Sequence, residues 1–455
     1  MTHRPSFQIV SVVVMLLMRI ASTPTANLSY LLLAAYAMFG RVQAIQALAL
    51  SWLFSVISPG IAAEATQGTV GRYAVLFAAA GSVLLRSGSL FRSRDIRINR
   101  VVFATILLGI GIVLHTLLFS SMKSVSLLKS VSWTVACATL ITAWSALSLD
   151  QRQVLAKQVY GGLVLVLVLS MPLLGNGLGY LVNGMGFQGV LNHPQAFGPT
   201  MAILGAWTMG RILTSPRPDF RMMGLFAACL VMIVLSEART AGFALVLAIL
   251  TASVVVQVLT RKRFVVLFPA IRSRRFQMAA LLAFAVMLVA APMLTGILQG
   301  YVAKRGGSTD ITEAYERSRG GLIDQMVANI KHDPWRGVGF GVASEPTEMV
   351  VSYDPVLGLP VGASIEKGVL PLAVVEELGI PGALAVLAWI WLLVRRSIQG
   401  AGLVPLALLF TALLLNMGEM MLFSPGGMGL LLLVVIGLAA SEKPQVRRHA
   451  GAEHG

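Results

Sequence analysis

Long runs of apolar residues alternate with short polar segments along almost the whole chain. A helix needs about 20 apolar residues to cross a bilayer, and fewer when the helix is short. The pattern predicts membrane spans at 7–22, 27–40, 42–58, 72–91, 101–121, 126–148, 158–174, 195–213, 222–237, 240–259, 277–298, 371–394, 403–420 and 428–441. The first two are short and alternatively form one re-entrant unit, so we expect 12–14 transmembrane helices.

Composition agrees with this pattern, because 56% of the 455 residues are hydrophobic, 12% are charged, and the mean hydropathy is +0.81. Soluble chains carry about 25% charged residues. A disordered chain, a disulfide-rich scaffold and a compact soluble enzyme are therefore excluded. The predicted fold is an all-α polytopic membrane protein with a helix bundle at 1–298, a large loop at 299–370, further transmembrane helices at 371–441 and a basic tail at 442–455.

The positions of Lys and Arg predict how the helices are oriented, because cytoplasmic loops are enriched in these residues. With the N-terminus in the cytoplasm, most of the 35 basic residues and few of the 19 acidic residues fall on the cytoplasmic side. The net charge of +16 is then a topology signal and not a sign of nucleic-acid binding. Both termini are expected in the cytoplasm, and the long hydrophilic segment 299–370 is expected on the outer face.

This outer segment is expected to contain one amphipathic helix, beginning at 308–310 and ending at Asp333-Pro334. Arg319 lies four residues before the apolar Ile323 and therefore points with the apolar stripe toward the membrane body. A cation on that face needs an anionic partner, from the protein or from a ligand. Arg317 points elsewhere and is expected to be solvated.

A second candidate is Arg239, in the segment Ser236–Thr240 that joins two apolar runs with almost no loop between them. At the membrane boundary its guanidinium group is suited to hold a phosphate or carboxylate through two parallel hydrogen bonds. The alternative is an ion pair with Glu237. His193 precedes Pro194 at the start of another span, where it is expected to cap a helix and is also a candidate for substrate binding.

Two further segments of the outer loop carry candidate chemistry. The alternating glycines of Pro334–Gly341 form either a tight turn or a loop that presents N–H groups to an anion, with Arg336 beside it. Glu366 and Lys367 precede an apolar helix that begins around Glu377. Carboxylates at this boundary are either solvated or, when desolvated, act as a general base.

Sequence motifs for other chemistries are absent. The chain has no phosphate-binding GxxxxGK[ST] loop, which argues against nucleotide hydrolysis. It has no HExxH, no CxxC and no DxD pair in an outer loop, so we expect neither a catalytic metal nor another cofactor.

Four segments together resemble the family of bacterial O-antigen polymerases and O-antigen ligases, which are membrane glycosyltransferases. They are Asn192–Pro199, Ser236–Arg239, Arg319–Gly341 and Glu377–Gly382, and they occur in this order on the predicted outer face. One departure concerns a loop His that ligases of the family carry about nine residues before the closing Glu. Gly368 stands at that position here, which favours a polymerase over a ligase.

The resemblance implies a glycan donor carried on undecaprenyl diphosphate, acting at the periplasmic face of the bacterial inner membrane. Arg239 and Arg319 would hold the diphosphate, with His193, Arg336 and Lys367 as further substrate contacts. The general base would be Glu366, or alternatively Glu377. The acceptor would be a glycan or lipid A-core, and the expected partners are membrane lipids and other polysaccharide-assembly proteins, with no nucleic acid.

Two other classes of membrane protein remain as alternatives. One is a peptidoglycan polymerase of the shape, elongation and division kind, whose outer-face Asp would be Asp310 or Asp324. The other is a flippase or transporter of lipid-linked glycans. Transporters usually carry charges inside many spans, whereas here the span interiors are almost free of them.

Overall fold

The computed structural model describes residues 5–87, 96–181, 184, 186–289, 311–354, 358–363, 367–400 and 402–442. The first group of helices is α1 (Pro5–Ala21), α2 (Thr23–Ala37), α3 (Arg41–Val56), α4 (Gly68–Ser87), α5 (Ile96–Phe119), α6 (Lys123–Ser145) and α7 (Leu149–Ser170). The chain continues through the 3-10 turns η1 (Met171–Gly175) and η2 (Gly177–Tyr180) to α8 (Pro194–Thr214), α9 (Phe220–Leu235), α10 (Arg239–Thr260), α11 (Phe264–Leu267), η3 (Pro269–Arg272) and α12 (Arg274–Val289). The last part holds α14 (Ile311–His332), η4 (Pro346–Glu348), β1 (Val351–Tyr353), β2 (Pro360–Ala363), α15 (Leu370–Ile398), α16 (Leu403–Leu414), η5 (Leu415–Met417) and α17 (Met428–Ser441).

Six of the described helices are long and apolar enough to cross a membrane, namely 68–87, 97–119, 123–145, 149–175, 239–260 and 370–398. Every predicted apolar run overlaps a helix, although part of the run at 277–298 lies outside the described residues. The chain is therefore an all-α protein with several helices suited to a membrane. The antiparallel ribbon of β1 and β2 was not predicted, because strands of three and four residues are too short to give an alternating pattern.

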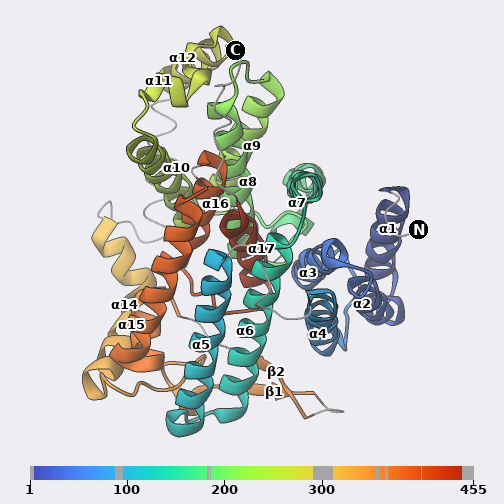
Figure 1. The fold of residues 1–455 in the computed structure, drawn as a ribbon, viewed down its shortest axis with the longest axis vertical. Helices are drawn as coiled ribbons and strands as arrows, with labels where there is room; N and C mark the ends of the chain where they lie inside the picture. Colours follow the sequence, from blue (N-terminus) through green and yellow to red (C-terminus); the bar gives the residue numbers. More distant parts are fainter. Residues whose placement is uncertain are drawn as a thin grey trace, which may run out of the picture.

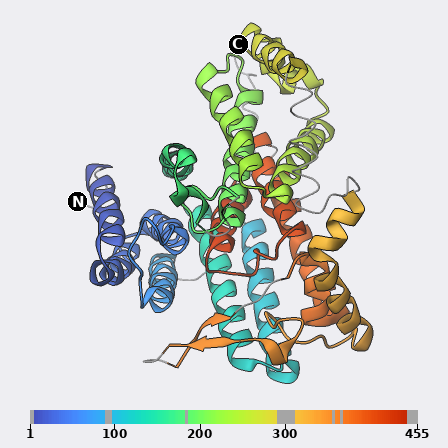
Figure 2. The same cartoon turned by 180° about the vertical axis from the view of Figure 1, so that it is seen from behind.

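The core lies around α17, whose 14 residues are all buried. This helix packs on α6 and α16, and α5 runs beside α6 (Figure 1). In the view from behind, α14 lies along α15, and the loop that carries β1 and β2 crosses the end of the bundle (Figure 2). Helices α1 to α4 form a group at one side, and α11 and α12 lie at the end opposite the β-ribbon (Figure 1).

Three loops at one end of the helices are joined by backbone hydrogen bonds. The backbone N–H of Ser58 donates to the carbonyl of Val190 at 2.9 Å, and that of Phe187 donates to the carbonyl of Leu235 at 2.8 Å. The first bond joins the α3–α4 loop to the α7–α8 loop, and the second joins the latter to the end of α9. These three segments therefore lie together at one end of the helices.

The same set of contacts continues through the segment after η5. Gly418 lies so close to Thr240, at the start of α10, that a Cβ on Gly418 would overlap the threonine side chain. Two residues later the N–H of Met420 donates to the carbonyl of Lys367 at 3.1 Å. Two residues span at most about 7 Å, so the α9–α10 junction and the segment before α15 are neighbours.

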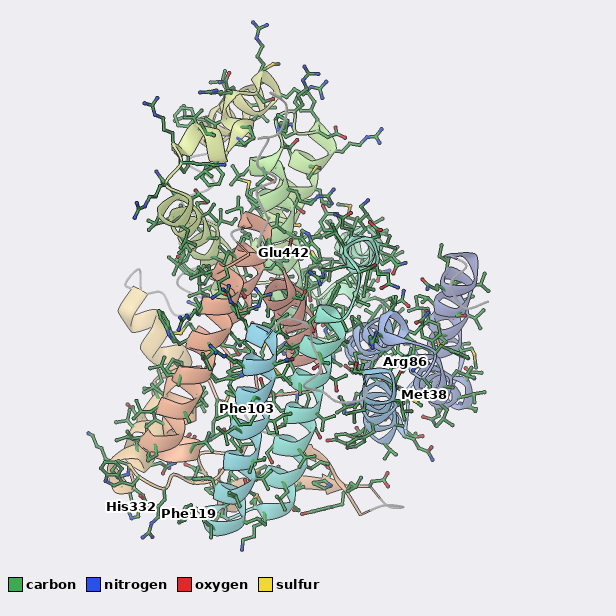
Figure 3. The ribbon with its side chains drawn as sticks, in the orientation of Figure 1. Met38, Arg86, Phe103, Phe119, His332 and Glu442 are labelled. Carbon is green, nitrogen blue, oxygen red and sulfur yellow. The ribbon has the colours of Figure 1, made fainter. Side chains whose placement is uncertain are left out.

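At the opposite ends of the helices, arginine side chains bind the final backbone carbonyls. Arg86 donates to the carbonyl of Met38 at 2.7 Å, and Arg152 donates to that of Ser441 at 2.6 Å. Figure 3 shows Arg86 beside Met38 and Glu442 far from His332 and Phe119. These carbonyls have no partner within their own helices, and a cation also complements the helix dipole. The basic excess at these loops thus also caps helix ends.

Candidate functional site

The site begins where Asp333 turns the chain at the end of α14. Its carboxylate accepts hydrogen bonds from the N–H groups of Trp335 at 3.2 Å and Arg336 at 3.0 Å. These bonds stabilise the charged carboxylate, and the amide of Arg336 is the main cause of the lowered pKa of Asp333. The turn leads directly into residues 334–341, which we call the Gly loop.

Three glycines of this loop adopt backbone angles that other residues rarely reach. The φ angles are +70° at Gly337, +116° at Gly339 and +69° at Gly341. Glycine adopts such angles without the clash that a Cβ would cause. A Cβ on Gly337 would also lie 2.6 Å from the carbonyl oxygen of Glu376. The positive φ angles therefore need glycine, and Gly337 in particular allows the close approach of the loop to α15.

Helix α15 is broken at the point where the Gly loop meets it. Gly379 has φ +65° and ψ 178°, and Pro381 follows two residues later. Proline has no N–H, so it cannot donate to the carbonyl of Glu377 as a helical residue would. The N–H of Gly339 donates to that carbonyl instead, at 3.0 Å, and the N–H of Val338 donates to Glu376 at 2.8 Å.

The third bond of this junction runs in the other direction. The N–H of Ile380 donates to the carbonyl of Pro334 at 2.8 Å, and a Cβ on Gly379 would overlap the carbonyl of Trp335. The Gly-Ile-Pro-Gly sequence of α15 therefore provides the free backbone groups that bind the Gly loop. Loop and broken helix form one hydrogen-bonded unit.

Beneath this unit lies a buried cluster of charged side chains. Lys367 Nζ is 2.7 Å from Glu376 Oε2 and 3.3 Å from Glu377 Oε1, and all three side chains are almost completely withdrawn from solvent. The remaining carboxylate oxygens also have donors: Asn329 Nδ2 lies 2.7 Å from Glu376 Oε1, and Gly341 N lies 2.7 Å from Glu377 Oε2. The carboxylate of Glu377 thus holds the Gly loop by its side chain as well as by its backbone.

A second lysine completes the cluster. Lys129 of α6 interacts electrostatically with Glu377, and its Nζ lies 5.4 Å from the centroid of the Phe340 ring. The positive charges of two lysines therefore neutralise the negative charges of two glutamates in this region. Phe340 is fully buried, and its ring lies 5.6 Å from that of Phe423, which lies 4.8 Å from Trp133. The Gly loop is thus anchored in the aromatic core.

An apolar groove runs between α5 and α15 beside the loop. Its volume is about 550 Å³, and its lining includes Ala104, Gly111, Phe119, Gly382 and Ala388. The lining residues of α5 extend from Ala104 to Phe119, which corresponds to about 22 Å at 1.5 Å per residue. Phe119 lies at the same end of the molecule as His332 (Figure 3), so the groove begins at the level of the Gly loop.

The loop end of this groove carries the polar groups. His115 lines the groove, and its Nε2 contacts the carbonyl of Arg336 at 2.5 Å. Because a carbonyl only accepts, Nε2 carries the proton, and the buried Nδ1 has no hydrogen-bond partner among the described residues. The exposed guanidinium group of Arg336 lies 5.8 Å from the Phe119 ring centroid. The cationic side chain of Arg336 therefore lies at the loop end of the apolar groove.

The residues predicted for the site from the sequence lie in three different surroundings: the buried cluster, the Gly loop and the first turns of two helices. It brings Lys367 and Glu377 together in the buried cluster, with Arg336 on the adjoining loop. Arg239 is half-buried at the first position of α10. His193 caps α8 as expected, because its Nδ1 accepts the N–H of Gln195 at 3.0 Å.

Two predicted residues cannot be placed in this site. Glu366 lies outside the described residues, and only the backbone of Arg319, within α14, is described. Their assigned roles stay predictions. For Glu377, burial and its contacts with Lys367 and Gly341 favour holding the loop over acting as a base.

Three side chains of the site were not selected from the sequence. Glu376 directly precedes the selected Glu377, Asn329 lies on the predicted amphipathic helix, and Lys129 lies inside a predicted span. Lys129 could have been selected from the sequence, because a charged side chain within a membrane span needs a partner. Asn329 could not, since its partners Ser344 and Glu376 are brought to it by the turn after α14.

Among the described residues, no group of three or more His, Cys, Asp and Glu side chains is placed to hold a metal ion. No model of a known protein family matches this chain, and no curated protein is similar to it.

Proposed function

We propose that this protein is a glycosyltransferase that uses a glycan linked to a polyprenyl diphosphate and extends a polysaccharide at the membrane face where the Gly loop lies. The loop end of the bundle would be the outer, periplasmic face. The chain would belong to the bacterial inner membrane, with 12–14 spans and both termini in the cytoplasm. Polymerisation is preferred to ligation because Gly368 replaces the loop His typical of ligases.

The observation that carries the proposal is the groove between α5 and α15, with Arg336 at its mouth. An apolar channel about 22 Å long fits a polyprenyl or acyl chain, and a guanidinium group suits a phosphate. The hydrogen bonds from α15 and His115 fix the loop that carries this cation. A cation on a fixed loop loses less conformational freedom on binding an anion than a cation on a mobile one.

In the proposed reaction, a hydroxyl oxygen of the acceptor attacks the anomeric carbon of the donor. The bond between that carbon and the diphosphate oxygen breaks, and the diphosphate leaves with the electron pair. Arg239, Arg319 and Arg336 would stabilise this leaving group, with His193 as a further contact. Lys367 is buried between Glu376 and Glu377 and is not proposed to touch the substrate. The proton of the hydroxyl would pass to a carboxylate, for which Glu366 is the candidate, because both carboxylate oxygens of Glu377 are engaged by Lys367 and Gly341.

The direct test uses the purified chain in detergent, without any ion gradient, together with a synthetic glycan on polyprenyl diphosphate. Longer glycan and free polyprenyl diphosphate are the expected products. Intact donor after prolonged incubation with protein that binds it would refute the proposal. In a deletion strain, loss of long chains with single units retained identifies a polymerase, whereas a lipid core bare of glycan identifies a ligase.

A transporter of the same lipid-linked glycan is the second candidate, and the buried charged cluster favours it. Ionisable groups inside membrane proteins often take part in ion-coupled transport. Lys367, Glu376 and Glu377 form such a cluster close to the loop end of the bundle. A requirement for a proton gradient, with no change in glycan length, would identify this function.

A further inference from the structure

A second surface lies far from the Gly loop, between α10 and α12. There the chain forms a compact structured connection, which we call the basic platform (residues 261–275). Arg261 ends α10 in the left-handed conformation at φ +51°, α11 and η3 follow, and α12 begins at Arg274. Phe268 and Ala270 are buried, and η3 packs against α8. The platform is therefore fixed to the helix bundle.

The platform carries a concentrated positive charge. Its exposed basic residues are Arg261, Lys262, Arg263, Arg272, Arg274 and Arg275. The sequence contains no acidic residue between Glu237 and Asp310, and none of the six forms an ion pair with a described residue. Figure 3 shows long side chains with nitrogen tips extending outward around α11 and α12. This charge is available to an external anion.

Large apolar side chains are exposed on both sides of the platform. Val258 in the last turn of α10 and Leu281 on α12 are 68% and 69% exposed. Helix α10 is long and apolar enough to span a membrane, and large apolar side chains on such a helix face lipid chains. From these exposed apolar side chains on both sides we infer that the platform lies at the level of the lipid headgroups.

The short helix α11 adds an apolar contribution. Phe264 and Val266 are exposed, and the Phe264 ring lies 4.5 Å from that of the buried Phe268. Exposed aromatic side chains beside Arg and Lys are typical of segments that lie in the membrane interface.

We propose that the basic platform binds the anionic phosphate headgroups of phospholipids in the adjoining leaflet. Each basic residue near a membrane surface strengthens the attraction to anionic lipid by about fivefold. An acidic soluble protein is the competing partner. The flanking lipid-facing residues and exposed Phe264 favour lipid, because a docking site for a soluble protein would project into water.

The first experiment measures lipid binding to the full chain in detergent by native mass spectrometry. Phosphatidylglycerol and phosphatidylcholine with the same acyl chains are the probes. The variant Arg261→Gln/Lys262→Gln/Arg263→Gln is compared with Lys157→Gln/Arg217→Gln/Arg221→Gln, which removes three exposed charges elsewhere. Melting temperatures are measured for both variants as a control for folding.

We expect the wild-type chain to prefer phosphatidylglycerol, and the platform variant to lose at least tenfold in affinity for it while the control loses threefold or less. An equal loss in both variants would mean that lipid follows net charge alone, and the proposal would be wrong. No preference for phosphatidylglycerol in the wild-type chain would overturn it equally.

A second experiment locates the platform without changing its charge. The variant Phe264→Cys is labelled with an environment-sensitive dye and reconstituted into vesicles; the native Cys137 and Cys229 are buried and are not expected to react. Quenching by spin-labelled lipid supports the proposal. Quenching by aqueous iodide alone would place residue 264 in water, which excludes the lipid site and favours an acidic protein partner.

Discussion

Gly339 donates its backbone N–H to the carbonyl of Glu377 at 3.0 Å, replacing the helical donor that Pro381 lacks. Through this bond, a break in one helix becomes the attachment point for a loop. The carbonyl of Glu376 is satisfied in the same way by Val338. Both free carbonyls of the broken helix therefore have loop donors, as buried backbone groups require.

Gly379→Ala is predicted to detach the Gly loop from α15. A Cβ at this position would overlap the carbonyl of Trp335. The backbone angles of φ +65° and ψ 178° also lie in a region that essentially only glycine adopts, and they cost another residue about 1–3 kcal/mol. We expect faster hydrogen exchange at the amides of Val338 and Gly339, with loss of glycan transfer. The measurement is exchange followed by mass spectrometry of peptides from this loop.

The matched control for this change is Gly162→Ala in α7, where a Cβ would meet nothing within 4 Å. That variant is expected to be neutral or stabilised by up to about 1 kcal/mol, because alanine favours helix over glycine. Normal exchange at Val338 in the Gly379→Ala variant would mean that the loop does not depend on the break in α15.

Lys367→Met is predicted to destabilise the fold strongly. It leaves the buried carboxylate of Glu376 without the cation that lies 2.7 Å away. Removing one partner of a buried ion pair typically costs about 3–5 kcal/mol. Thermal unfolding in detergent measures this change.

The double variant Lys367→Met/Glu376→Gln is expected to recover at least half of that loss. It removes both charges of one pair, while Lys129 still interacts with Glu377. If the double variant is less stable than Lys367→Met alone, the cluster is not organised as two neutralising pairs.

The helices were predictable from the sequence because each depends on a local run of apolar residues. The end of α14 was also predictable: Asp333-Pro334 marks it, and the helix ends at His332. The partnership of Lys129 with Glu377 was not predictable, because only the packing of α6 against the loop region brings together residues so far apart in sequence. The same holds for the groove, which depends on how α5 meets α15.

The turn at Asp333 is predicted to weaken in acid. The folded-state pKa of this carboxyl lies below its usual value of 3.8 because the Arg336 amide binds the charged form. The stabilisation that the charged carboxylate gives to the turn is therefore complete above the unfolded-state pKa of Asp333. It is lost as the pH falls through the lower folded-state pKa. Asp333→Asn keeps an acceptor at every pH, so acid should open residues 335–336 in the wild-type chain but not in this variant. Pepsin cleavage of the loop between pH 2 and 4 measures the difference, and equal cleavage in both chains would contradict it.

Filling the groove is predicted to impair use of a long-chain donor. Gly111 lines the groove, and a Cβ at this position would meet nothing within 4 Å, so Gly111→Leu places a side chain into the channel. We expect KM for a long polyprenyl donor to rise at least tenfold, with little change for an analogue of two isoprene units. Gly81→Leu in α4 has equal local space and lies outside the groove, which makes it the control. The groove is not the chain-binding site if both variants give the wild-type KM.

Replacing the proposed diphosphate ligands is predicted to stop the reaction without unfolding the protein. Arg239→Ala and Arg319→Ala should each abolish the glycan product, because each removes a cation that stabilises the leaving diphosphate. Arg239→Lys should fail almost as completely, since lysine cannot make two parallel hydrogen bonds to a phosphate. Arg317→Ala is the control on the same helix, because its position is off the apolar face and is expected to be solvated. Product yield and chain length are measured by gel electrophoresis beside the melting temperature. Full activity in either of the alanine variants at positions 239 and 319 would remove that arginine from the site, and equal losses in Arg317→Ala would show that the effect of position 319 is only structural.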